Sequence, residues 1–126
     1  MIAMQTAAPS LPSFRVRRVT EYIEQNLEKE LRLAELAALV CMSPYHFARL
    51  FKGSTGVPPH RFVLRRRVAH ARALLAAPEL SIAQIAGRVG FRRPSHFTTV
   101  FRRVSGLTPR DYRNDALRDG GWNELR

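Results

Sequence analysis

One pattern of residues occurs twice in this chain, and its second copy begins 49 residues after the first. The members of the first copy are Leu31, Leu33, Ala34, Leu36, Ala37, Val40, His46, Phe47, Phe51, Lys52, Gly56, Pro59 and Phe62. Their counterparts are Leu80, Ile82, Ala83, Ile85, Ala86, Val89, His96, Phe97, Phe101, Arg102, Gly106, Pro109 and Tyr112. The offset grows to 50 because the second copy has one extra residue between its two helices. A repeat of this length is a supersecondary unit, and each copy is predicted to fold as helix, tight turn, helix.

Each copy has small or permissive residues where two closely crossing helices need them. Ala37 and Ala86 give the first helix of each copy a small side chain facing its partner. Four residues later comes the turn, where a residue with positive φ is easiest to accommodate. Gly90 holds this position in the second copy and Cys41 in the first. The apolar anchors of the two second helices are Phe47 and Phe97.

Helical spacing of apolar residues continues outside the repeat, and no strand pattern is present, so we predict an all-α fold. Ser43 and Pro44 are predicted to start one helix, and Ser81 with Gln84 has the form of a capping box. The predicted organisation is a flexible arm over residues 1–14, a helix-turn-helix subdomain over 15–57, a linker helix over 58–77, a second helix-turn-helix subdomain over 78–113 and a polar, fraying tail over 114–126.

The net charge of +11 points to an acidic polymeric partner, either nucleic acid or an anionic membrane surface. All 21 basic residues except Lys29 and Lys52 are arginine. This excess of arginine has two alternative explanations, which are recognition of phosphate and guanine and codon bias. No apolar run approaches the roughly 20 residues that span a bilayer, and the N-terminus has no signal-peptide pattern. We therefore expect a soluble, cytoplasmic, nucleoid-associated protein without a membrane partner.

Two recognition helices on a basic chain predict that double-stranded DNA is the partner. With the phenylalanines buried, the outward residues are Tyr45, Ala48, Arg49 and Lys52 in the first unit, and Ser95, Thr98, Thr99 and Arg102 in the second. The N-terminal residues of a recognition helix lie near base edges in the major groove. Arg49 can bind guanine bidentately, which is worth about 1–3 kcal/mol of discrimination. Short hydroxyl side chains in the second unit should read bases less sharply, through methyl contacts.

A second set of residues is predicted to contact phosphate, which positions the protein without specifying sequence. These residues are His46, Lys52, Arg93, His96, Arg102 and Arg103. The two histidines have packing as their alternative role, and we expect no metal site from them because they lie in different subdomains. The lone Cys41 excludes an internal disulfide and a multi-cysteine zinc site.

At these residues the chain resembles the DNA-binding domain of the AraC/XylS family of bacterial transcription regulators, over residues 17–113. The resemblance is carried by LAELAALVCMSPYHFARLFKGSTGVPPHRFV, RRRVAHARALL and IAQIAGRVGFRRPSHFTTVFRRVSGLTPRDYR. It implies about seven helices, with one long helix joining two helix-turn-helix subdomains. It also implies that both recognition helices enter successive major grooves, roughly 34 Å apart on one duplex.

The resemblance also implies which positions face the bases. These are Tyr45, Ala48 and Arg49 in the first unit, and Pro94, Ser95, Thr98 and Thr99 in the second. Two departures stand out. Thr99 occupies a position where related members often have arginine, and Arg92-Arg93 replaces small or acidic residues before the second recognition helix.

We therefore predict a sequence-specific DNA-binding transcription regulator that acts on RNA polymerase, for instance as an activator, and needs no cofactor. The alternative is a non-specific architectural nucleic-acid-binding protein. An enzyme is not expected, because no nucleophile stands beside a base and no metal-ligand cluster or phosphate-binding glycine loop is present. The chain has no room for a small-molecule ligand domain, so we expect either a minimal regulator or a fragment of a longer protein.

Overall fold

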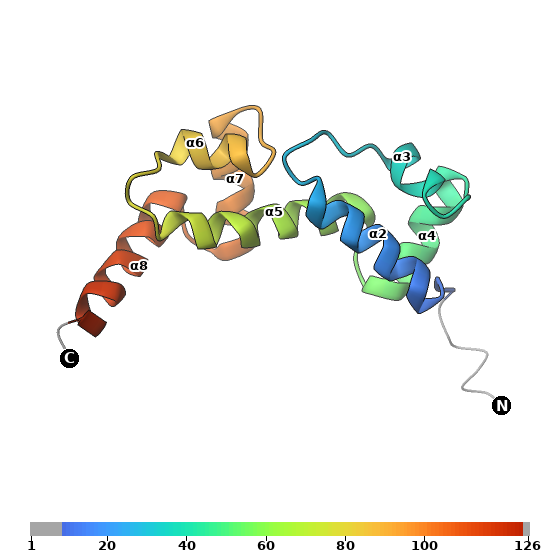
Figure 1. Cartoon of the computed structure of the whole chain (residues 1–126), viewed down its shortest axis with the longest axis horizontal. Helices are drawn as coiled ribbons and strands as arrows, with labels where there is room; N and C mark the ends of the chain where they lie inside the picture. Colours follow the sequence, from blue (N-terminus) through green and yellow to red (C-terminus); the bar gives the residue numbers. More distant parts are fainter. Residues whose placement is uncertain (1–8, 125–126) are drawn as a thin grey trace. The chain divides into compact units, whose positions relative to one another are not determined.

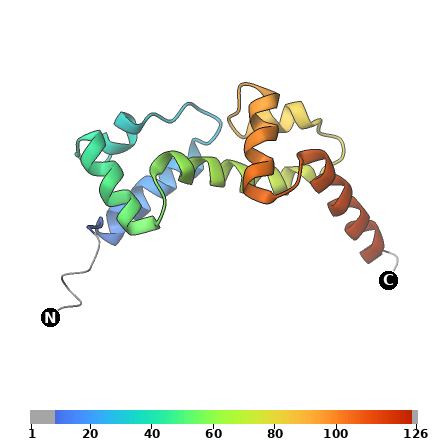
Figure 2. The same cartoon turned by 180° about the vertical axis from the view of Figure 1, so that it is seen from behind.

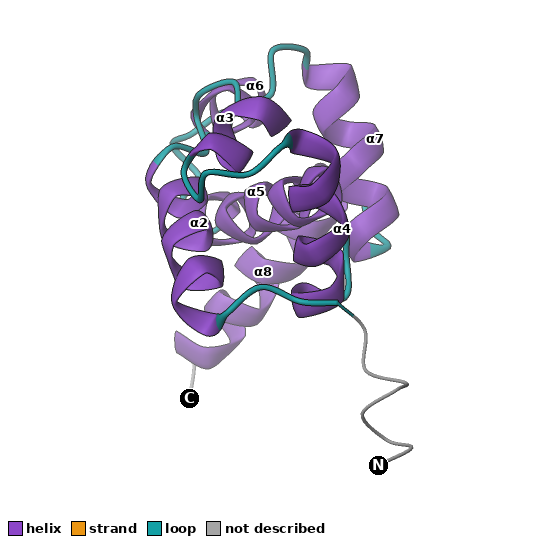
Figure 3. Ribbon diagram, turned by 90° about the vertical axis from the view of Figure 1, so that its right-hand side faces the viewer, coloured by secondary structure: helices purple, strands orange, loops and turns teal. Residues whose placement is uncertain are grey.

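The computed structural model describes residues 9–124, and the side chains of residues 9–118. The described helices are α2 (Ser13–Gln25), α3 (Leu33–Ala38), α4 (Pro44–Thr55), α5 (Pro59–Leu75), α6 (Ile82–Arg88), α7 (Pro94–Ser105) and α8 (Pro109–Glu124) (Figure 1). Figure 3 shows only helices and loops in this part of the chain. The predicted all-α fold of about seven helices is confirmed. No helix within the described residues is both long and apolar enough to span a bilayer.

The chain divides into two compact units, and the boundary lies within α5, between Val63 and Leu64. The first unit contains α2, α3, α4 and the start of α5. The second contains the rest of α5 with α6, α7 and α8. Each unit has its own hydrophobic core, so α5 supplies the last helical segment of one unit and the first of the other.

The core of the first unit is centred on two phenylalanines that lie one turn apart on α4. Phe47 and Phe51 are fully buried, and their ring centroids are 5.5 Å apart. The ring of Phe62, from the start of α5, meets Phe51 edge-on at 5.3 Å. Edge-on aromatic pairs of this kind add about 0.5–1.5 kcal/mol beyond the burial of their area. This cluster fixes which face of α4 is turned inward.

The second unit repeats this arrangement on α7. Phe97 and Phe101 are fully buried with centroids 5.6 Å apart, and Tyr112 of α8 meets Phe101 at 5.5 Å with its ring tilted by 77°. Tyr112 is thus the structural counterpart of Phe62, as the repeat in the sequence predicts. Figure 2 shows α7 together with α6 and the beginning of α8, and α7 contacts both helices.

The turn between the two helices of each unit depends on one residue with positive φ. Gly90 has φ of 98° and Cys41 has φ of 57°. Cys41 is the one non-glycine residue with positive φ in the described part of the chain. Glycine adopts this conformation without steric cost, whereas a side chain makes it unfavourable. Both turn residues occur where the sequence predicted them.

The same backbone hydrogen bond closes both turns. The Met42 N–H donates to the Ala37 carbonyl oxygen at 3.1 Å, and the Phe91 N–H donates to the Ala86 carbonyl oxygen at 2.9 Å. Ala37 and Ala86 are themselves buried, which matches the prediction of small residues at the helix crossing. The two units therefore have the same turn geometry, and their separate cores have the same arrangement of phenylalanines.

The predicted helix starts are correct in position and partly correct in chemistry. At α6 the Ser81 hydroxyl accepts from the Gln84 N–H at 3.0 Å, and the Gln84 side chain accepts from the Ser81 N–H at 2.8 Å. The capping box is therefore confirmed. Ser43 occupies the N-cap of α4 and Pro44 follows it, but the Ser43 side chain makes no capping bond. Its contribution at this end is the extended backbone that precedes proline.

The arm predicted over residues 1–14 is wrong for its second part, while residues 1–8 lie outside the described part of the chain. Leu11 is buried in the first core, and its N–H donates to the Ser54 hydroxyl at 2.8 Å. The Pro9 carbonyl oxygen approaches α4 so closely at Gly53 that an added Cβ would lie 1.7 Å from it. Leu11 is the apolar group that holds this segment against α4, and α2 begins at Ser13.

The polar tail predicted over residues 114–126 is also wrong within the described residues, because α8 continues to Glu124. Its first turns are tied to the second unit by Arg113. The Arg113 Nε and Nη2 atoms donate to the carbonyl oxygens of Leu75 and Ala77, each at 3.1 Å. Carbonyls at the end of a helix have no partner within the helix, so Arg113 satisfies the C-terminus of α5. An ion pair between Asp115 and Arg118 follows on the next turn.

We expect Cys41→Gly to raise the free energy of unfolding by about 0.5–1 kcal/mol, because relief of the positive-φ cost exceeds the added entropy of the unfolded chain. Gly90→Ala should lower it by about 1–2 kcal/mol, since alanine has that cost to bear. Urea unfolding followed by circular dichroism measures both. Gly87→Ala is the matched control: Gly87 lies in α6 with open space around it, and alanine there should stabilise. A loss of stability in Cys41→Gly would contradict this account of the turn.

Candidate nucleic-acid interface

The exposed face of α4 is the one opposite its buried phenylalanines. Tyr45 is 81% exposed, and Arg49 and Lys52 are also exposed. Ala48 and Leu50 are half-buried. The long polar side chains therefore leave α4 on one side, and they begin at its N-terminal turn. This is the end of a recognition helix that lies nearest base edges.

On α7 the corresponding face has a different chemistry. Phe97, Val100 and Phe101 are buried, so the helix turns its other side outward. Pro94, Ser95, Thr99 and Arg102 are exposed and Thr98 is half-buried. The first two turns of this face carry hydroxyl groups where α4 carries tyrosine and arginine. The two units share a scaffold and present different side chains on it.

Both threonine hydroxyls of α7 are bonded to their own helix. The Thr98 hydroxyl donates to the Pro94 carbonyl oxygen at 3.1 Å, and the Thr99 hydroxyl donates to the Ser95 carbonyl oxygen at 3.0 Å. A threonine hydroxyl has one hydrogen to donate. In this arrangement each hydroxyl oxygen can accept a hydrogen bond from another molecule but has no hydrogen left to donate. Each side chain also carries a methyl group.

Phe91 connects the turn of the second unit to both α5 and α7. Its ring is almost fully buried and lies 5.4 Å from the His96 ring and 5.3 Å from the Phe97 ring. The guanidinium of Arg67, on α5, lies 5.8 Å from the centre of the same ring. Burial lowers the pKa of Arg67, and the guanidinium remains charged at neutral pH. These contacts hold the first turn of α7 against α5.

Phe91 was not singled out from the sequence, although a signal for it was present. It matches Met42 in the first unit at an offset of 49 residues, and Met42 is half-buried. An apolar residue at the same place in both turns indicates core contact. The structure also gives His96 the packing role that was one of its two predicted alternatives, while leaving the residue exposed.

The residues predicted to contact phosphate are all exposed. His46, Lys52, Arg93, His96, Arg102 and Arg103 make up this set. Arg93 is the N-cap residue of α7 and its side chain makes no capping bond, while Arg102 and Arg103 lie in the last turn. Residues 1–63 contain 8 basic and 5 acidic residues, whereas residues 64–126 contain 13 and 5. The second unit therefore carries most of the net positive charge.

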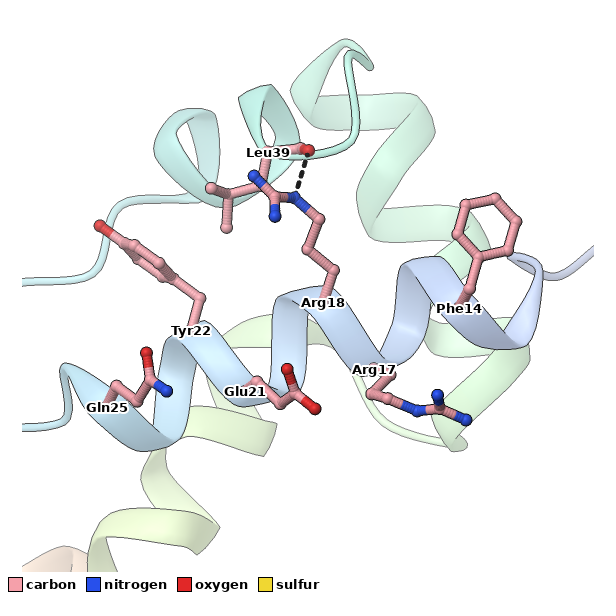
Figure 4. A pocket seen from close by; sticks show the side chains of 7 residues that line it. All are labelled: Phe14, Arg17, Arg18, Glu21, Tyr22, Gln25 and Leu39. Carbon is pink, nitrogen blue, oxygen red and sulfur yellow. Dashed lines mark hydrogen bonds between the residues drawn. The ribbon is translucent and has the colours of Figure 1, made fainter.

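An open groove of about 260 Å³ lies on another face of the first unit (Figure 4). Its lining residues are Phe14, Arg17, Arg18, Glu21, Tyr22, Gln25 and Leu39. The Arg18 Nε donates to the Leu39 carbonyl oxygen at 3.2 Å and so bonds the end of α3. The Tyr22 hydroxyl donates to the Glu35 carboxylate, which raises the pKa of Tyr22. None of the predicted DNA-contacting residues lines this groove, so it is separate from the candidate interface.

Three comparisons with known proteins agree with this geometry. A family model described as a helix-turn-helix domain matches residues 36–115. Regulatory protein PocR of Salmonella typhimurium is 38% identical over 108 residues, which are 86% of this chain and 36% of that protein. The chain thus spans little more than a third of the length of this curated relative.

Two solved structures are similar over most of their length. The DNA-binding domain of AdpA, a global transcriptional factor solved in complex with a target DNA, is 33% identical with a TM-score of 0.76, covering 80% of this chain and 91% of that one. A transcriptional regulator of Chromobacterium violaceum, described as containing an AraC-type DNA-binding domain, is 31% identical with a TM-score of 0.77, covering 82% and 93%. The chain therefore belongs to the AraC family of transcription regulators, and the matched part is the family's DNA-binding domain.

Proposed function

We propose that this chain regulates transcription by placing α4 and α7 in successive major grooves of one promoter site. The observation that carries the proposal is the duplicated unit, in which a polar helix face begins at the N-terminal turn of each recognition helix. The AdpA domain, which is similar over most of its length, was solved with a target DNA. On B-DNA, successive readings from one face lie about one helical turn apart, roughly 34 Å.

In this proposal the two units divide the work of recognition. The first unit reads the sequence most sharply, because Arg49 can donate two hydrogen bonds to guanine O6 and N7, and Tyr45 can pack on thymine methyl groups. The second unit carries 13 basic residues against 5 acidic ones, and so supplies most of the attraction to the phosphate backbone. On α7 and its N-cap, Arg93, His96, Arg102 and Arg103 are the residues assigned to phosphate contact.

The polar diversity of the two faces favours a sequence-specific reader over an architectural binder. A protein that binds by charge alone needs only lysine and arginine on its DNA-facing surface. Tyr45, Ser95 and Thr99 are exposed there and carry no charge. We propose a non-enzymatic role for the same chain, since this surface has the groups for reading base edges. As a regulator that activates promoters, it would have RNA polymerase as its second partner.

Selection from random duplexes of about 25 base pairs, read out by sequencing, tests the proposal. We expect a two-part motif whose halves lie about one helical turn apart, since each recognition helix reads one major groove. Enrichment of a single short motif would contradict base reading by α7. Salt-sensitive binding without any enrichment would instead support the architectural alternative, because phosphate contacts alone give affinity without sequence preference.

Two substitutions on α4 should separate base reading from phosphate contact. We expect Arg49→Ala to weaken binding to the selected site by about 1–3 kcal/mol while hardly changing binding to random DNA. Lys52→Ala should weaken both alike and reduce the slope of log K against log salt by about one unit. Fluorescence anisotropy titrations at several salt concentrations measure both effects. Equal losses on specific and random DNA in Arg49→Ala would refute its base-reading role, and an unchanged slope in Lys52→Ala would refute its phosphate contact.

A further inference from the structure

We propose that α7 reads A·T base pairs through thymine methyl groups, with Thr98 and Thr99 as the residues that set this preference. The inference rests on the proposed function, because it assumes that the exposed face of α7 enters a major groove. It goes further by naming the base pair and the chemical group that this half of the protein recognises.

The first step is the direction of the two hydroxyl hydrogens. Thr98 donates to the Pro94 carbonyl oxygen and Thr99 to that of Ser95, at 3.1 and 3.0 Å. Guanine presents two acceptors, N7 and O6, to the major groove. A side chain that reads guanine must therefore donate a hydrogen bond. Neither threonine can do so while its hydrogen is bonded to its own helix.

The second step is the pair of groups that remain. Each threonine has a methyl group and an acceptor oxygen, held in one rotamer by the bond to the helix. In the major groove an A·T pair presents an adenine amino donor and a thymine methyl group, with the thymine O4 acceptor between them. A G·C pair also offers an amino donor and, like the A·T pair, two acceptors, but it has no methyl group. The A·T pair matches both remaining groups.

The third step is the absence of a long cationic donor on this part of α7. At the position equivalent to Thr99, α4 has Arg49, which can donate to guanine bidentately. Residues 94–101 contain no lysine or arginine. His96 follows Ser95 in the first turn of α7, and its ring packs edge-on against the ring of Phe91. Apart from the Ser95 hydroxyl, the first two turns of α7 therefore present the threonine methyl groups and acceptors as their reading groups.

Replacement of thymine by uracil tests this inference, because uracil lacks only the C5-methyl group. The site comes from the random-duplex selection, and the half whose preference is lost in Arg49→Ala is assigned to α4. Uracil at a thymine in the other half should weaken binding of the unaltered chain about threefold to fivefold, which corresponds to the burial of one methyl group. Uracil at thymines outside both halves is the DNA control and should leave binding unchanged.

Two matched protein variants complete the test. Thr99→Ser keeps the hydroxyl and removes the methyl group, and Thr99→Val keeps a methyl group in place and removes the hydroxyl. The three residues differ little in helix propensity, so the helix is retained. We expect Thr99→Val to remain sensitive to uracil and Thr99→Ser to lose that sensitivity, with the same result for the Thr98 pair.

The outcomes separate this inference from the proposed function. A two-part motif whose α7 half is rich in G·C pairs, or one that is indifferent to uracil, would overturn the inference and leave the proposed function standing. Uracil sensitivity that survives in both serine variants would also overturn it. If the selection from random duplexes of unmodified DNA gave no two-part motif, the proposed function itself would be overturned.

Discussion

The position of each recognition helix depends on the tight turn that precedes it. In each turn one residue is held at positive φ, four residues after a buried alanine. Cys41 and Gly90 reverse the chain within a few residues, and the bond that closes each turn ends on the carbonyl of Ala37 or Ala86. The short turn restricts where Phe47 and Phe97 can lie, because each must enter the core beside the first helix of its unit. Once Phe47 is buried, the helical period determines which side chains of α4 point outward.

The same scaffold can carry two different exposed surfaces, because the residues that form the core are not the residues that form the DNA-reading face. The aromatic contacts of Phe47 with Phe51 and of Phe97 with Phe101 are alike to within 0.1 Å in centroid distance. The outward positions between these phenylalanines are under no such constraint. One unit there carries Arg49 and the other Thr99, so the duplicated scaffold presents two readers of different chemistry.

The parts of the structure set by local chemistry were predictable from the sequence. The capping box of Ser81 with Gln84 and the glycine at position 90 act within a few residues of themselves. The repeat extended this prediction to the core, because Phe47 and Phe97 occupy equivalent places and are both fully buried. The exposed predicted contacts follow from the same periodicity, and their roles toward DNA stay predictions.

What the sequence did not predict depends on contacts between distant residues or on rotamers. Leu11 stands in an aperiodic, proline-broken segment, and its burial depends on Ser54 and Gly53, more than 40 residues away. The length of α8 was missed because its polar residues and Gly120-Gly121 give no periodic apolar signal.

The rotamers of the α7 threonines were equally out of reach of the sequence. A threonine hydroxyl can turn toward its own helix or toward solvent, and only coordinates show which. The bonds of Thr98 and Thr99 to their own helix convert a general expectation of methyl contacts into a specific assignment.

Hydroxyl-radical footprinting of the chain on its selected duplex tests the central claim most directly. If both copies of the repeat bind DNA, two protected windows should lie about one helical turn apart on one face of the duplex. Lys52→Ala should then weaken protection in one window and Arg102→Ala in the other. A single protected window, weakened by Lys52→Ala and unaffected by Arg102→Ala, would show that the second unit does not bind the groove and would contradict the account.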